Sequence, residues 1–181
     1  MYRKNLEANL IANYSEYVKK INSALDTELD LYSKSEFKEP LKYALSEGEV
    51  IESRLETSED ITFDDYLKVI EYKTATAFET ASRLGGIISG GTDVEIESLA
   101  DYGKNIGIAY QIRDDLHDWK NEDKLFNLLI KNSSDPRDVF NDMEELLKKY
   151  TDRAVFSIRK IKDSQAKNNL ENLVRFTTTT V

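Results

Sequence analysis

Apolar side chains recur at steps of three and four residues along most of this chain, which is the spacing of an amphipathic helix. The first such stretch spans residues 6–32, and the second spans residues 37–55 with Gly48 in its middle. Only 2 prolines and 7 glycines occur among 181 residues, which is few for a chain rich in turns. No Val/Ile-rich alternating run or Asn-Gly hairpin signal is present. The sequence therefore predicts an all-α protein.

Two threonines mark further helix starts. Thr62 and Thr92 are each followed three residues later by a carboxylate, Asp65 and Glu95, which is the pattern of a capping box. The helix after Thr62 should end at one of the glycine pairs 85–86 and 90–91. Asp135 before Pro136 is a third start signal. The expected helices cover residues 62–84, 92–119, 136–161 and 165–176.

Charge and composition exclude several functions. Lys and Arg total 25 against 34 Asp and Glu, a net charge of −9, which argues against nucleic acid as a partner. With no cysteine and one histidine, a thiolate nucleophile or a cysteine metal site is excluded. The N-terminus does not resemble a signal peptide, and the longest uncharged stretch, residues 84–92, is too short for a transmembrane segment. We expect a soluble, cytoplasmic protein.

The most informative motif lies in the helix expected over residues 92–119. Gln111, Asp114, Asp115 and Asp118 are spaced i, i+3, i+4 and i+7, so they share one helix face. Neighbouring carboxylates repel each other, and a hard cation such as Mg²⁺ removes that cost. Asp114, Asp115 and Asp118 are therefore candidate metal ligands. The alternative is a solvated acidic helix end.

A second motif lies on the preceding helix. Lys73 could hold a phosphate group as a point charge. The alternative is a surface lysine beside an ordinary packed helix. A stripe of small residues follows it and would allow tight helix packing or line an elongated pocket: Thr74, Ala77, Ala81 and Gly85.

Together the two motifs resemble the trans-isoprenyl diphosphate synthases, or polyprenyl synthetases. Residues 73–75 are similar to the Lys-Thr-Ala segment of that family. Tyr102-Gly103 and residues 107–118 are similar to its Tyr-Gly and Gly-Ile-Ala-Phe-Gln-x-x-Asp-Asp-x-x-Asp segments, with Tyr110 where Phe is usual. Both motifs occur in the family's order and separation, and the similarity covers about residues 48–119.

This resemblance implies an antiparallel helix bundle of the isoprenoid-synthase type around a deep apolar cavity. Family members condense an allylic prenyl diphosphate with isopentenyl diphosphate, and Mg²⁺ ions clamp the allylic diphosphate. Asp114 would be a direct Mg²⁺ ligand, supported by Asp115 and Asp118. The resemblance also implies a homo- or heterodimer.

The resemblance gives roles to further residues. Lys73 would contact the diphosphate, and Thr74 and Gln111 would lie beside the reacting carbons. The family usually has a Gly-Lys pair after the aspartate motif, where this chain has only Lys120 and Lys124. Lys124 is then the candidate for that phosphate contact.

Two family motifs are missing from this sequence. The first aspartate-rich motif with its Arg-Arg pair is absent, and so is the Gly-Lys-Arg-x-Arg-Pro segment that binds isopentenyl diphosphate. Residues 1–48 resemble the family's N-terminal helices, and residues 49–181 resemble its C-terminal half. We therefore expect one shortened domain that omits central helices, either naturally or by engineering. An alternative alignment places all of residues 44–52 in the downstream part.

Three functions remain open at this point. The first is a prenyltransferase with half of its site absent from this chain, inactive alone unless a second subunit supplies carboxylates. The second is a non-catalytic regulatory or scaffolding subunit of a prenyl diphosphate synthase. The third is a helical bundle with no link to isoprenoids.

Overall fold

The computed structural model describes residues 35–58, 60–120 and 125–178. All regular structure in these ranges is helical, which confirms the all-α prediction. The helix predicted over residues 6–32 lies outside the described residues, as does Lys124. None of the described helices is long and apolar enough to cross a bilayer.

The helices follow one another with short connections. In chain order they are α2 (Ser35–Leu55), α3 (Phe63–Ile70), the π-helical turn η1 (Glu71–Ala75), α4 (Thr76–Ile88), α5 (Asp93–His117), α6 (Leu125–Asn132), α7 (Pro136–Ser157), the 3₁₀ turn η2 (Ile158–Lys160) and α8 (Gln165–Thr178). The helix expected over residues 62–84 is therefore α3, η1 and α4 in succession. It ends near the second of the two glycine pairs, where Gly90 has a φ of +69°.

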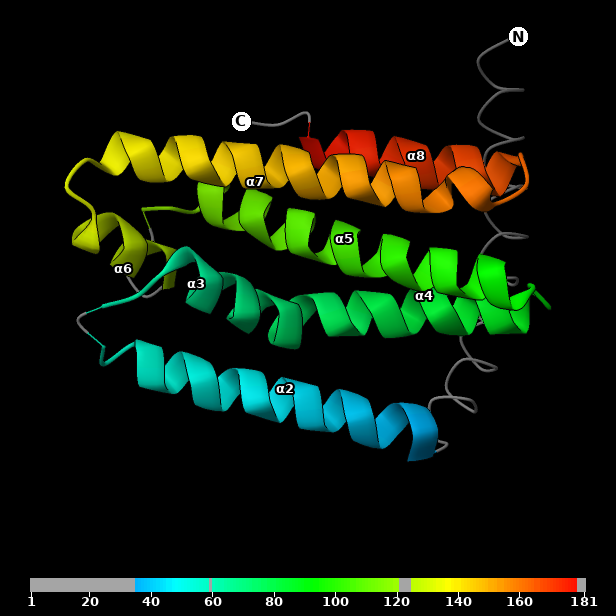
Figure 1. Cartoon of the computed structure of the whole chain (residues 1–181), viewed down its shortest axis with the longest axis horizontal. Helices are drawn as coiled ribbons and strands as arrows, with labels where there is room; N and C mark the ends of the chain where they lie inside the picture. The colour runs from blue at the N-terminus through cyan, green and yellow to red at the C-terminus, as the bar shows by residue number, and fades with distance from the viewer. Residues whose placement is uncertain (1–34, 59, 121–124, 179–181) are drawn as a thin grey trace, which may run out of the picture.

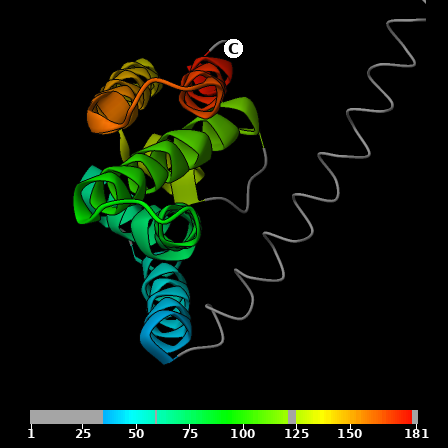
Figure 2. The same cartoon turned by 90° about the vertical axis from the view of Figure 1, so that its right-hand side faces the viewer.

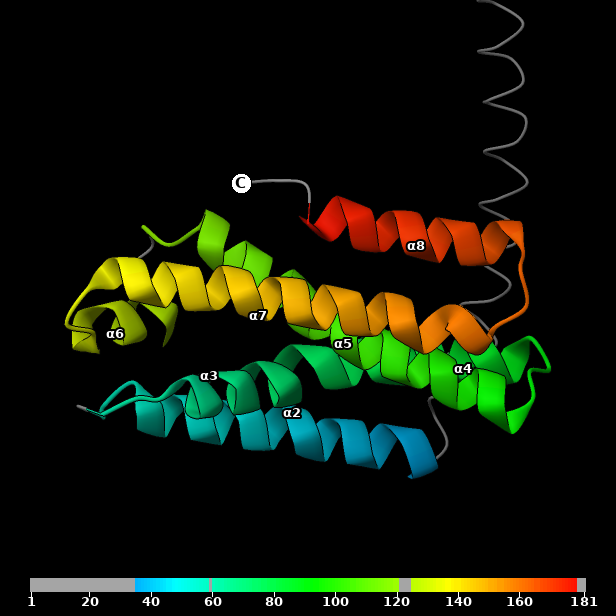
Figure 3. The same cartoon turned by 45° about the horizontal axis from the view of Figure 1, so that its top comes forward.

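The helices form a layered bundle with α5 at its centre. Figure 1 shows α2 below the row formed by α3 and α4, with α5 next and α7 beyond it. Figure 2, which turns the bundle by 90°, shows the same order of helices from α2 to α7. Figure 3 shows α8 beside α7. Helix α5 packs against α4 on one side and α7 on the other. Its side chains therefore reach both halves of the bundle.

Two clusters of buried side chains form the core. The larger cluster joins α3, α5, α6 and α7 around Tyr66, Ile112, Phe126 and Met143. The smaller one packs the first half of α5 against α7, η2 and α8 through side chains that include Tyr102. Four members of the larger cluster line the same cavity as the predicted site residues Lys73, Thr74, Gln111 and Asp115: Tyr66, Val69, Ile70 and Leu125.

Both predicted capping boxes are present. The Thr62 hydroxyl accepts a hydrogen bond from the Asp65 amide at 3.2 Å, and the Asp65 carboxylate accepts one from the Thr62 amide at 3.1 Å. Thr92 and Glu95 make the same reciprocal pair at the start of α5. The hydrogen bonds from the Thr62 side chain and backbone lower the pKa of Asp65. The two caps fix where α3 and α5 begin.

Glycines in α5 allow α4 to approach closely. A Cβ atom at Gly103 would lie 2.8 Å from Cβ of Ser82, and one at Gly107 would lie 2.8 Å from Cα of Ala75. Real Cβ atoms are not found at such distances from carbon, so only glycine fits at both positions. The spacing of α5 from α4 and from η1 therefore depends on these two residues.

We expect Gly103→Ala to lower the free energy of unfolding by about 1–3 kcal/mol, because the added methyl group would overpack this contact. Gly85 of α4 is the matched control, since a Cβ there would meet nothing within 4 Å. Gly85→Ala should raise stability by about 0.5–1 kcal/mol through the better helix propensity of alanine. Urea unfolding followed by circular dichroism measures both changes, and equal effects would contradict the close packing.

The cap at Thr62 should make stability depend on acid pH. The pKa of Asp65 is lowered in the folded state, so its contribution is complete above the ordinary pKa of 3.8 and is lost as the pH falls through the folded value. The stability difference between the wild type and Asp65→Asn should therefore shrink as the pH falls through and below the ordinary pKa of 3.8. Asp64→Asn removes the same charge from the same turn outside the capping box and should leave this pH dependence in place. A constant difference for Asp65→Asn would refute the assignment.

Candidate functional site

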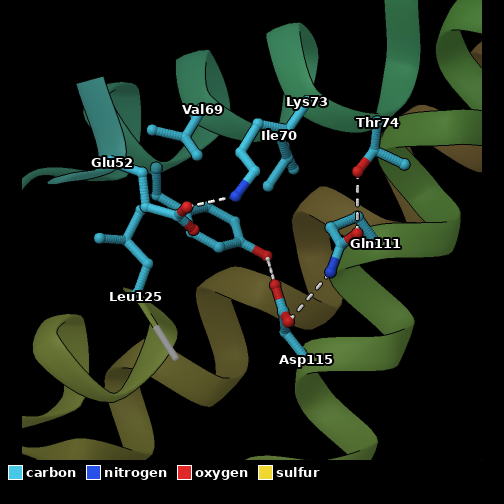
Figure 4. Close-up of a pocket in the computed structure, with 9 residues that line it drawn as sticks. Glu52, Val69, Ile70, Lys73, Thr74, Gln111, Asp115 and Leu125 are labelled. Atoms are coloured by element: carbon cyan, nitrogen blue, oxygen red, sulfur yellow. Dashed lines mark hydrogen bonds and ion pairs between the residues drawn. The ribbon is translucent and has the colours of Figure 1, made fainter. Parts of the chain in front are cut away.

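A cavity of about 180 Å³ lies between α2, α3, η1, α5 and the start of α6. Figure 4 shows that its walls bring the two sequence motifs together: Lys73 and Thr74 face Gln111 and Asp115 across the cavity. The remaining lining residues are Glu52, Tyr66, Val69, Ile70 and Leu125. Four of the seven predicted site residues therefore share one cavity.

The π-helical turn η1 carries Lys73 and Thr74. The amide and the hydroxyl of Thr76 both donate to the Glu71 carbonyl, five residues back, with the hydroxyl at 2.8 Å. This wider turn interrupts the α-helix where two consecutive residues, Lys73 and Thr74, both line the cavity. Single π turns within α-helices occur frequently at functional sites. The apolar spacing of the sequence carries no signal for this turn.

Lys73 is held by two carboxylates of α2. Its Nζ donates to Glu52 and lies 3.0 Å from Oε1 of Glu49. Desolvation acts to lower the pKa of Lys73, but the hydrogen bonds to Glu52 and Glu49 outweigh it and raise the pKa. Lys73 therefore remains charged, and the cavity contains an ion pair that sequence reasoning missed.

Gly48 allows α2 to lie close to Lys73 in η1. A Cβ atom at this position would lie 2.6 Å from Cγ of Lys73, so a side chain would displace the lysine. The mid-helix glycine noted in the sequence thus marks the close approach of α2 to η1. Glycine is unfavourable inside a helix, and this close contact gives a physical reason for its presence in α2.

A chain of hydrogen bonds crosses the cavity floor. The Thr74 hydroxyl donates to Oε1 of Gln111 at 2.9 Å, and Nε2 of Gln111 donates to Oδ1 of Asp115 at 3.1 Å. The hydroxyl of Tyr66 donates to Oδ2 of Asp115 at 2.6 Å. Burial and then the charge of Asp115 raise the pKa of Tyr66 well above its usual value, so its hydroxyl stays protonated.

The three aspartates of α5 are in different environments. Asp115 is buried in the cavity, while Asp114 is half-buried in the last turn. Asp118 is the C-terminal cap of α5 and is exposed, with Oδ1 at 3.1 Å from Nδ1 of His117. Among the residues that the structure describes, no three histidine or acidic side chains form a ready metal-binding group. Their role as metal ligands stays a prediction.

The model of the polyprenyl synthetase family matches residues 9–174, which is most of the chain. The chain belongs to the polyprenyl synthetase family. This confirms the resemblance drawn from the Lys-Thr-Ala and aspartate motifs.

This chain aligns with individual family members over only part of their length. The geranylfarnesyl diphosphate synthase of Natronomonas pharaonis is 32% identical over 117 residues, which are 63% of this chain and 34% of that protein. The octaprenyl diphosphate synthase of Escherichia coli is 43% identical over 75 residues, or 41% of this chain and 23% of that one. The chain thus spans only about a quarter to a third of the length of the curated relatives it matches.

Solved structures of the family share the fold. A decaprenyl diphosphate synthase from Rhodobacter capsulatus superposes with a TM-score of 0.69 at 24% identity, over 80% of this chain and 58% of that one. A polyprenyl synthase from Caulobacter crescentus, complexed with calcium and isoprenyl diphosphate, superposes with a TM-score of 0.68 at 23% identity. The superposition covers 84% of this chain and 60% of that one. The bundle is therefore of the isoprenyl-synthase type.

The Lys73 ion pair predicts an effect on anion binding. An anion that enters the cavity must compete with Glu52 for the ammonium group, so Glu52→Gln should tighten the binding of inorganic pyrophosphate about two- to fivefold. Glu56→Gln removes the same charge from an exposed position one turn further along. Isothermal titration calorimetry in the presence of Mg²⁺ compares the two variants with the wild type. Equal affinities for both would contradict a competing role of Glu52.

Proposed function

We propose that this chain binds a prenyl diphosphate with Mg²⁺ at the cavity and takes part in the condensation of an allylic prenyl diphosphate with isopentenyl diphosphate. The observation that carries the proposal is the convergence of Lys73, Thr74 and Gln111 in one cavity. A cation, a hydroxyl and an amide there suit a ligand with an anionic head and an uncharged chain. Val69, Ile70 and Leu125 supply the apolar part of the wall.

Lys73 would hold the diphosphate in this function. Its ammonium lies at the cavity wall and is charged, and a lysine serves phosphate as a point charge. Thr74 and Gln111 would lie beside the reacting carbons, where their oxygen atoms stabilise developing positive charge. Both side chains are already fixed by their mutual hydrogen bond. The residues bind and orient, and no nucleophilic side chain is needed.

Asp114 would be the direct Mg²⁺ ligand, with Asp115 and Asp118 in support. Carboxylate oxygens are the ligands that Mg²⁺ prefers, and it keeps several of its waters when bound to one or two carboxylates. The half-buried Asp114 and the exposed Asp118, four residues apart at the end of α5, fit such a water-rich site. When bound, Mg²⁺ neutralises diphosphate oxygens and so eases departure of the diphosphate.

The chain would need help to catalyse condensation. The first aspartate-rich motif and the basic isopentenyl diphosphate segment are not in this sequence. We therefore propose that residues 1–48 and 49–181 form one shortened domain and that a second subunit, a copy or a longer synthase, supplies the missing carboxylates. Lys124 would add a phosphate contact after the aspartate motif.

One observation favours the alternative, a regulatory subunit. Lys73 already has carboxylate partners in Glu49 and Glu52, so its charge is matched before any diphosphate arrives. A subunit that no longer turns over would tolerate this arrangement. It would alter the activity or product length of a synthase partner rather than form product itself.

The binding proposal predicts a loss in Asp114→Ala. Affinity for farnesyl diphosphate should depend on Mg²⁺ in the wild type. The variant should bind at least about tenfold more weakly, because metal affinity falls by that much even when only a residue that hydrogen-bonds to a metal ligand is changed. Asp101→Ala is the control, because it removes an exposed aspartate from the same helix. Calorimetry with and without Mg²⁺ measures the affinities. Unchanged binding by Asp114→Ala would overturn the metal assignment.

A condensation assay separates the two functions. Purified chain, Mg²⁺, isopentenyl diphosphate and allylic diphosphates of several lengths are incubated, with the Asp114→Ala/Asp115→Ala variant alongside. Product that disappears in the variant would establish a prenyltransferase. Mg²⁺-dependent binding without product, together with a changed product length when a family synthase is added, would favour the regulatory subunit.

A further inference from the structure

We propose that Tyr66 is a positioning residue of this site: it acts through Asp115 to fix the orientation of the Gln111 amide. The consequence for ligand binding rests on the proposed function, whereas the effect on Gln111 does not. Tyr66 carries no motif signal in the sequence, and its role follows from its hydrogen bond and burial alone.

Tyr66 joins two elements that are far apart in the sequence. Its side chain projects from α3 and is 1% exposed, and its hydroxyl donates to Oδ2 of Asp115 on α5 at 2.6 Å. Asp115 is itself 5% exposed. A buried carboxylate needs donors, because burial without them is costly. Tyr66 meets that need from α3, which contributes to the cavity wall together with α5.

Asp115 passes this constraint to Gln111. Its second oxygen, Oδ1, accepts from Nε2 of Gln111, so the amide nitrogen must point at the carboxylate. The amide oxygen Oε1 then faces the Thr74 hydroxyl, which donates to it. With the carboxylate held by Tyr66, only one of the two amide orientations satisfies both neighbours.

Loss of the Tyr66 hydroxyl would release this arrangement. The carboxylate of Asp115 would rotate toward other donors, and Gln111 would lose the acceptor that orders its nitrogen. Thr74 and Gln111 would then present their oxygens to the cavity in more than one arrangement. A ligand that requires one arrangement would bind more weakly.

Tyr102 provides a matched control. It is also a buried tyrosine, 2% exposed, and its hydroxyl donates to the Leu170 carbonyl at 3.0 Å. Tyr102→Phe therefore loses one tyrosine hydrogen bond, as Tyr66→Phe does, but this bond is part-buried and belongs to the smaller core cluster. Any effect that follows only from lost stability should appear in both variants.

The first readout is the side-chain amide of Gln111 in ¹⁵N–¹H spectra, assigned by its absence in Gln111→Glu. We expect its two proton signals to shift or broaden in Tyr66→Phe and to stay unchanged in Tyr102→Phe. The second readout is the affinity for inorganic pyrophosphate with Mg²⁺, which should fall about tenfold in Tyr66→Phe only. Asp115→Asn provides a second variant if Tyr66→Phe does not fold.

A double-mutant cycle tests the route through Asp115. If Tyr66 acts through that carboxylate, Tyr66→Phe should weaken binding much less in the Asp115→Asn background than alone. Unchanged Gln111 signals in folded Tyr66→Phe, or fully additive losses in the cycle, would overturn the proposal. A wild type that binds no pyrophosphate would instead contradict the proposed function, and the Gln111 signals would still decide the positioning role.

Discussion

The close approach of η1 to α5 at Gly107 is the contact on which the site depends. Because Gly107 has no side chain, the backbone of Ala75 lies directly against α5. One turn further along α5, Gln111 then meets the hydroxyl of Thr74. Gly48 does the same on the other side, where it brings α2 against Lys73. Because these two glycines have no side chains, α2, η1 and α5 approach closely enough for their side chains to form hydrogen bonds with one another.

Much of this fold is predictable because its signals are local. Thr62 and Thr92 mark their helix starts through hydrogen bonds made within three residues, and the structure contains both. The all-α class follows from apolar periodicity in the same way. The π turn η1 was not predictable, because its wider hydrogen bonds leave the apolar spacing almost unchanged. It divides what the sequence presents as one helix into α3 and α4.

The site was only partly predictable for a related reason. Residue types that carry chemistry, such as Lys73, Gln111 and Asp115, stand out in a motif and share the cavity. Glu52 and Tyr66 belong to no motif, and they reach the cavity only through tertiary packing of α2 and α3. Where the helix ends was less predictable: α5 ends at His117, and Asp118 is its exposed C-terminal cap, with its amide still donating to the Asp114 carbonyl.

The electrostatics of the cavity explain why an added cation suits the proposed function. Among the described residues that line it, Lys73 is the one cation, and it faces the carboxylates of Glu52 and Asp115. A diphosphate entering such a cavity would be repelled by the carboxylates and would gain little from a lysine that is already paired. A bound divalent cation changes the sign of the local charge for the incoming anion. In this arrangement diphosphate and metal should bind together, and each should bind poorly alone.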